Sequence, residues 1–175
     1  MRSLTDQLSQ YATYHRDRRN VLTHFVGIPM IVLALTTLLG RWVLVSWPLN
    51  LPGGTAHIDL TAAGVVSSLV SLYYLRLDAR FGLVMSVLLS VLTLAGESLA
   101  QHPFAEWLTW GLGLFLVGWV FQFVGHYFEG RKPAFVDDLI GLLIGPLFVV
   151  AEAGFLMGLR RDVEAQVIRQ AGALR

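Results

Sequence analysis

The residues best suited to chemistry in this chain are its histidines, because the sequence contains no cysteine. There are five of them: His15, His24, His57, His102 and His126. Imidazole is the commonest metal ligand in proteins, and three imidazoles suit iron, zinc or copper. The lack of cysteine excludes disulfides, thiolate metal sites and cysteine nucleophiles. A metal site built from histidines is therefore the first hypothesis to test against the rest of the sequence.

The composition places these histidines in a membrane protein. Hydrophobic residues make up 55% of the 175 positions and charged residues only 14%, whereas soluble domains carry about 25% charged residues. The net charge of +1, with scattered basic residues, excludes a nucleic-acid footprint. Five apolar stretches approach the ~20 residues that a helix needs to cross a bilayer: Phe25–Trp47, Ile58–Leu75, Phe81–Leu99, Trp107–Phe128 and Leu139–Leu159.

We therefore predict an all-α fold, an integral membrane helical bundle with four to five apolar spans and no strands. Leu4–Tyr14 precedes the spans and has the apolar spacing of an amphipathic helix. The chain is interpreted as a single membrane domain over residues 1–175. Residues 1–20 form the amphipathic helix and a basic turn, 25–159 the transmembrane bundle, and 160–175 a C-terminal tail.

The positions of Lys and Arg predict the orientation of the spans. Basic residues precede the first span and lie between the second and third and between the fourth and fifth, whereas the connectors Trp47–Gly54 and Ala100–Trp107 contain none. We therefore place the N-terminus and the basic loops on the cytoplasmic side. The fifth segment contains Pro146 and is followed directly by Arg160 and Arg161. This favours a broken or re-entrant segment that returns to the cytoplasmic side; a complete fifth span is the alternative.

This topology brings three histidines to one membrane level, on the cytoplasmic side. His15 and His24 flank the entry to the first span, and His126 ends the fourth. His15 and His24 are nine residues apart, so they converge only if the chain turns between them. His102 precedes His126 by 24 residues, about 36 Å along a straight helix, so it joins the site only if a span is broken. No role is expected for His57, and the bland alternative for all five is that of interfacial polar groups.

Two polar residues share helix faces with the histidines. Asn20 lies four residues before His24, where it caps the helix or holds the histidine ring. Glu129 lies three residues after His126, where it offers a second ligand or a base. Both are candidates for the catalytic machinery.

Further charged residues are candidates with two interpretations each. Arg131 and its neighbour Lys132 either hold a substrate carboxylate or anchor their loop on the cytoplasmic side. Glu152, within the fifth segment, either hydrogen-bonds a ligand histidine or is a protonated or interfacial group. Asp137 and Asp138 are expected to cap the fifth helix.

Two blocks of sequence resemble the 2-hydroxy fatty acid dioxygenase family, which comprises small multi-spanning membrane proteins. They are Tyr14–Pro29 ("YHRDRRNVLTHFVGIP") and Phe121–Ala134 ("FQFVGHYFEGRKPA"), followed by Gly145–Glu152 ("GPLFVVAE"). The resemblance implies an Fe(II)-dependent dioxygenase that converts a 2-hydroxy fatty acid and O2 into the acid one carbon shorter and CO2. It also implies four iron ligands, namely His15, His24, His102 and His126, so it disagrees with the straight-helix argument about His102.

The resemblance also implies the setting of the reaction. The substrate supplies the electrons, its head groups chelate the metal, and its acyl tail lies between helices. Expected partners are the 2-hydroxy fatty acid, O2 and membrane lipid; a homo-oligomer is left open. The location would be a bacterial inner membrane, or the endoplasmic reticulum of a eukaryote. The alternatives are a lipid-binding membrane protein without activity, and a membrane zinc hydrolase with Glu129 as the base.

Overall fold

A computed structural model describes residues 3–52, 54–134 and 139–175. These residues form seven helices and a two-stranded sheet. In chain order they are α1 (Leu4–Ala12), α2 (Arg18–Gly40), β1 (Val43–Leu51), β2 (Gly54–Thr61), α3 (Ala62–Leu77), α4 (Ala79–Ala100), α5 (Phe104–Glu129), α6 (Gly141–Leu156) and α7 (Arg161–Ala171). The expected helix cap at Asp137 and Asp138 lies outside the described residues.

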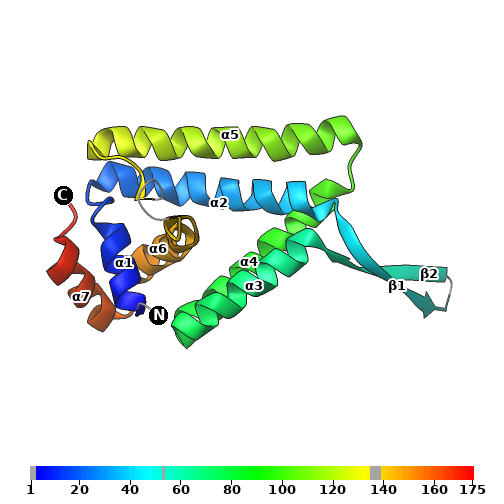
Figure 1. Ribbon diagram of the computed structural model, residues 1–175, viewed down its shortest axis with the longest axis horizontal. Coiled ribbons are helices and arrows are strands. Elements are labelled where there is room, and N and C mark those ends of the chain that lie inside the picture. Colours follow the sequence, from blue (N-terminus) through cyan, green and yellow to red (C-terminus); the bar gives the residue numbers. More distant parts are fainter. Residues whose placement is uncertain (1–2, 53, 135–138) are drawn as a thin grey trace.

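The helices form two long pairs and a small cluster at one end (Figure 1). α2 and α5 run side by side in opposite directions, and α3 and α4 form a second pair that lies obliquely to the first. The short helices α1, α6 and α7 gather where α2 begins and α5 ends. The chain therefore returns near its start, and the backbone N–H of Arg175 donates to the carbonyl of Arg16 over 2.8 Å.

Glycines let the long helices approach closely. A Cβ built on Gly27 of α2 would lie 2.7 Å from the carbonyl oxygen of Gly118 on α5. A Cβ built on Gly96 of α4 would lie 2.7 Å from the carbonyl carbon of Thr36 on α2. Small residues at such crossings allow van der Waals contact between helix backbones, the usual way in which helices associate in membranes.

Fewer helices are long enough to cross a bilayer than the sequence suggested. Among the described residues, α2, α4 and α5 have the length and apolarity of a span, and α6 with α7 would make a fourth. The second expected span forms α3, which has only 16 residues. The mostly helical fold is confirmed, while the number of spans is three or four by length and composition.

The last apolar segment ends in a sharp bend, as a broken or re-entrant segment would. Pro146 stays within α6, and the axes of α6 and α7 differ by 114° across the break before Arg161. Arg160 there adopts the left-handed conformation, with φ of 52°, and its guanidinium binds both carboxylate oxygens of Asp78. The expected C-terminal tail is largely helical, because Val163 and Val167 of α7 are buried in the core beside α1.

The prediction that the chain contains no strands is wrong. β1 and β2 pair as an antiparallel hairpin that projects beyond α2 (Figure 1). Val45, Trp47 and Leu49 pair with Leu60, Ile58 and Ala56, so they form one apolar face of the ribbon. The residues between them form a polar face, on which Ser46 donates to Asp59 over 2.6 Å. The alternation is visible in the sequence, but the predicted spans Phe25–Trp47 and Ile58–Leu75 included part of each strand.

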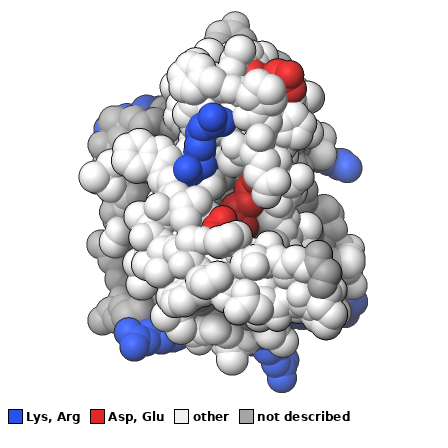
Figure 2. Space-filling view, turned by 90° about the vertical axis from the view of Figure 1, so that its right-hand side faces the viewer, with Lys and Arg blue, Asp and Glu red and all other residues white. Residues whose placement is uncertain are grey.

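The end of the molecule that carries the hairpin has few charged side chains. Figure 2 shows this end as mostly uncharged surface with isolated basic and acidic groups. The connectors Trp47–Gly54 and Ala100–Trp107 at this end carry no Lys or Arg. This is the side that the sequence predicts to face away from the cytoplasm.

Two glycines inside long helices allow a matched test of the packing. We expect Gly96→Ala to lower the free energy of unfolding by about 1–3 kcal/mol, because its Cβ would push α2 and α4 apart. Gly113→Ala meets nothing within 4 Å and should raise it by roughly 0.5–1 kcal/mol through helix propensity. Thermal unfolding in detergent measures both. Equal effects of the two substitutions would contradict the close crossing.

Candidate metal centre

Three histidines from separate parts of the chain meet in one buried cluster. His15 lies in the turn between α1 and α2, His24 in the first two turns of α2, and His126 in the last turn of α5. Their candidate ligand nitrogens all lie within 4.8 Å of one another. All three residues are buried, and their rings are mutually tilted, with centroids 4.5 to 5.2 Å apart. The predicted convergence of these residues is therefore what the fold produces.

The turn that brings His15 to His24 is made by the start of α2. Asp17 is the N-cap of α2, and its side chain accepts a hydrogen bond from the backbone N–H of Arg19 over 2.8 Å. A cap of this kind ends the preceding chain direction and begins the helix at Arg18. Of the two roles offered for Asn20, that of helix cap is excluded, because Asn20 lies inside α2.

Hydrogen bonds fix the ring orientation of two of the histidines. The Nδ1–H of His15 donates to the carbonyl of Tyr11 over 2.8 Å, and that of His24 donates to the carbonyl of Asn20 over 2.9 Å. Each ring therefore keeps its Nε2 lone pair free, in the tautomer that a metal requires. The two Nε2 atoms face each other at 3.0 Å.

This arrangement fits a bound cation. Two imidazole lone pairs at 3.0 Å repel each other unless a proton or a metal lies between them. Nitrogens bound to one metal at roughly 2.0–2.1 Å lie about 3.0–3.4 Å apart. The Nδ1 of His126 is also buried without a hydrogen-bond partner among the described residues. A metal ion held by the three histidines would remove both deficits.

Burial keeps His15 in the neutral form that binds metals. The apolar surroundings, followed by the nearby His24, hold the pKa of His15 well below its usual value. Tyr11 stacks on the ring, with centroids 4.1 Å apart and planes 6° from parallel, and burial raises the pKa of its phenol. Phe148 of α6 lies against the same ring with centroids 5.5 Å apart. His15 is thus held by aromatic contacts that the sequence did not reveal.

Glu129 connects the segments that carry the three histidines. Its Oε2 accepts hydrogen bonds from the backbone N–H groups of Arg16 (2.9 Å) and Asp17 (2.7 Å) and from the side-chain amide of Asn20 (3.1 Å). Its side chain is fully buried, and Arg175 approaches the other oxygen at 3.4 Å. With these donors the carboxylate positions the turn around His15, and it is not among the grouped ligands.

Asn20 supports the cluster with both its backbone and its side chain. Its carbonyl orients His24, while its amide donates to Glu129 and to the carbonyl of Tyr14 over 3.1 Å. The predicted interaction with His24 therefore occurs through the backbone. The side chain instead connects α2 to the end of α5, through Glu129, and to the turn after α1, through Tyr14.

A buried ion pair that the sequence analysis did not foresee lies behind His15. Arg16 donates to the carbonyls of His15 (2.9 Å) and Gly172 (2.8 Å), and its guanidinium lies 3.3 Å from Glu152. Both partners are 7% exposed. The sequence offered Glu152 either as a partner of a ligand histidine or as a protonated or interfacial group, and in the structure its partner is Arg16. The pair ties α6 and the C-terminal segment to the residue beside the metal ligand.

The side chains of two predicted site residues are not part of the cluster. Arg131 is exposed and donates to the carbonyl of Thr13 over 2.8 Å, so it fastens the loop after α5 to the end of α1. His102 is exposed and lies just before α5, which runs unbroken to Glu129. Its carbonyl accepts from Arg41, the C-cap of α2, over 3.0 Å. His102 is therefore at the opposite end of both α2 and α5 from the three buried histidines.

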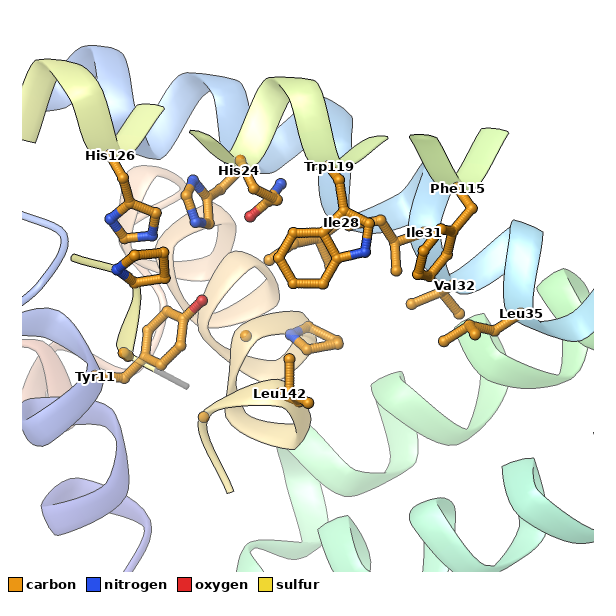
Figure 3. A pocket seen from close by; sticks show the side chains of 16 residues that line it. Tyr11, His24, Ile28, Ile31, Val32, Leu35, Phe115, Trp119, His126 and Leu142 are labelled. Carbon is orange, nitrogen blue, oxygen red and sulfur yellow. The ribbon is translucent and has the colours of Figure 1, made fainter. Parts of the chain in front are cut away.

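An apolar cavity of about 280 Å³ opens beside the histidines (Figure 3). His24, His126 and Tyr11 lie at one end of it. From there it runs between α2 and α5, with α6 on the remaining side. Its further lining is almost wholly hydrophobic and includes Ile28, Ile31, Val32, Leu35, Phe115, Trp119 and Leu142. The cavity can thus receive an elongated apolar molecule whose polar end meets the imidazoles of His24 and His126.

His102 and His126 give opposite predictions for metal content. We expect His126→Ala to lose stoichiometric metal, because it removes one of three converging ligands, while the helices still form. His102→Ala should keep the wild-type metal content, because it lies at the far end of α5. Metal analysis of the purified proteins and circular dichroism measure this. Loss of metal in His102→Ala would contradict the placement.

Glu129 should affect metal affinity without binding the metal. We expect Glu129→Ala to weaken metal binding about 10–100-fold, because the turn around His15 loses its acceptor. Glu129→Gln keeps one carbonyl acceptor and should retain most of the affinity. Titration with a competing chelator measures both, with exposed Glu106→Ala as the control. Equal losses in the two Glu129 variants would point to a carboxylate ligand instead.

The chain is similar to known proteins of one family. Residues 1–157 match the family model described as 2-hydroxy-palmitic acid dioxygenase Mpo1-like. The chain is 37% identical over 164 residues to the 2-hydroxy-palmitic acid dioxygenase MPO1 of Saccharomyces cerevisiae, covering 93% of this chain and 86% of that protein. No solved structure matches the chain significantly. The match spans nearly the whole chain, including all three buried histidines, so the protein belongs to the Mpo1-like family.

Proposed function

We propose that this protein is an Fe(II)-dependent dioxygenase that shortens 2-hydroxy fatty acids by one carbon. The observation that carries the proposal is the cluster of His15, His24 and His126 at the mouth of an apolar cavity. Membership of the Mpo1-like family supports a dioxygenase acting on this class of substrate. Three imidazoles suit iron, zinc or copper, so the choice of iron rests on the dioxygenase family.

The chain's own residues would bind and orient the substrate. The acyl tail would follow the cavity past Ile28 and Trp119, and the carboxylate and 2-hydroxyl would lie at the histidine end. Hydrogen bonds to the carbonyls of Tyr11 and Asn20 would keep the ligand nitrogens fixed while substrate enters. The hydrophobic lining would exclude water from all but the polar end.

The overall reaction balances without a further reductant. The bond between C1 and C2 breaks, C1 leaves as CO2, C2 becomes the new carboxyl carbon, and one water forms. The substrate loses four electrons and O2 gains four. Bound iron would supply the activation of O2, whose direct reaction with a fatty acid is slow.

The hydrolase alternative finds little support in the geometry. A zinc hydrolase would need Glu129 as a base on a metal-bound water. Its Oε2 already accepts three hydrogen bonds and faces the turn around His15. A carboxylate so engaged is committed to holding the turn around His15 in place.

We further propose that the site lies near the cytoplasmic face of a membrane. α2, α4 and α5 are candidate spans, and the basic turn at Arg18 and Arg19 lies at the histidine end of α2. An amphiphilic substrate could enter from the bilayer with its tail in the apolar cavity and its head near the interface. The membrane would be a bacterial inner membrane or the endoplasmic reticulum.

Activity should depend on both iron and O2. We expect purified protein, loaded anaerobically with Fe(II) and given 2-hydroxypalmitate and O2, to release the acid one carbon shorter, read by mass spectrometry. His24→Ala should give no product, and His57→Ala, in the hairpin, should be as active as wild type. Product formation with zinc, or without O2, would refute the dioxygenase mechanism. No product and no bound metal would favour a lipid-binding protein.

A further inference from the structure

Few polar groups face the cavity, and one of them has neither a hydrogen-bond partner nor a role in the candidate metal centre. Four buried side-chain atoms lack a hydrogen-bond partner in the described part of the chain: Ser9 Oγ, Asn20 Oδ1, Gln122 Nε2 and His126 Nδ1. Only Gln122 and His126 of these residues line the cavity. His126 is accounted for by the metal centre. The amide of Gln122, in a residue that is 94% buried, has no role in that centre.

The position of Gln122 along α5 places it between the metal centre and the acyl channel. It precedes His126 by four residues and follows Trp119 by three, so the three side chains share one face of the helix. The rise of the helix puts Gln122 about 6 Å from His126 along the axis, towards the apolar end. A molecule that binds the metal with its head and fills the channel with its tail must pass this amide.

The amide is held in place by the close crossing of α2 and α5. A Cβ on Gly27 would lie 2.3 Å from Gln122 Nε2, so the glycine leaves the space that the amide occupies. An unpartnered buried amide costs free energy, and its retention here indicates that a ligand supplies the missing hydrogen bond. Rotation about its last bond exchanges oxygen and nitrogen, so the amide can either donate to a hydroxyl or accept from it.

We propose that Gln122 is the specificity-determining residue that recognises the 2-hydroxyl group of the substrate. This inference rests on the proposed function for the choice of ligand. The substituent on C2 is the polar group nearest the tail, and Gln122 is the polar residue on the tail side of the histidines. A neutral amide suits a neutral hydroxyl, whereas the carboxylate is the charged end of the molecule, on the side of C2 away from the tail.

The test compares binding of two soluble acids that differ only in the hydroxyl. Affinities for 2-hydroxydecanoate and decanoate are measured by calorimetry on the full-length protein in detergent, loaded with Fe(II) without O2, and again metal-free. Wild type should prefer the hydroxy acid. Gln122→Met keeps the length of the side chain, and should lower that preference about tenfold in both states while leaving decanoate affinity within twofold.

Two further variants guard against an effect of folding alone. Gln122→Asn keeps an amide that is one carbon shorter, and should lower the preference severalfold, so it serves if Gln122→Met does not fold. Gln7→Met removes another buried glutamine, which lies on α1 outside this cavity, and should keep the wild-type preference.

The outcomes separate this inference from the proposed function. An unchanged preference in Gln122→Met, equal weakening of both acids, or no preference in wild type would overturn the role of Gln122. A preference that depends on Gln122 in a protein that turns over no 2-hydroxy acid would sustain the inference and refute the dioxygenase proposal.

Discussion

The geometry of the three-histidine cluster depends on the hydrogen bonds that the Glu129 carboxylate accepts. Glu129 lies three residues after His126, at the end of α5. It accepts hydrogen bonds from Arg16, Asp17 and Asn20, which lie between His15 and His24. A buried carboxylate is costly unless donors surround it, so this group both requires the turn and fixes it. The segment that carries His15 and His24 and the end of α5 that carries His126 are thereby joined through one side chain.

The C-terminal part of the chain completes this arrangement from behind. α6 and α7 do not supply grouped ligands, yet Phe148 contacts the ring of His15 and Glu152 pairs with Arg16. The backbone of Arg175 then bonds to that of Arg16. Breaking one partner of such a buried pair leaves an uncompensated charge. The rigidity of the site therefore comes from residues up to about 160 positions away from His15 in the sequence.

α2 and α5 together hold two of the histidines in place and line the apolar cavity. α2 and α5 approach closely at glycines, and this crossing places His24 and His126 side by side. The same pair of helices diverges from α6 to leave the apolar cavity. Metal ligands at one end and hydrophobic lining along the rest match an amphiphile, whose polar and apolar parts need such different surroundings.

Several features could be predicted from the sequence because they depend on local pattern and chain length. The lengths of the apolar stretches predicted the long helices, and apolar spacing predicted the short helix at the N-terminus. Loop positions placed His15, His24 and His126 at one level, and the length of α5 separated His102 from them. The family resemblance, which the comparisons confirm, gave the substrate class that the proposal rests on.

Other features required the tertiary structure because they depend on which side chains face one another. The sequence offered Glu129 as a ligand or base, and only its three donors to Oε2 identify it as a support. Arg16 could not be assigned from spacing, because its partner Glu152 lies on a distant segment. Tyr11 lies four residues before His15, but only the structure shows its ring stacked on the imidazole. The hairpin was not predicted because its strands adjoin apolar helices, and parts of both strands were included in the predicted spans. Burial, hydrogen-bond direction and the unpartnered amide arise only when the segments pack together.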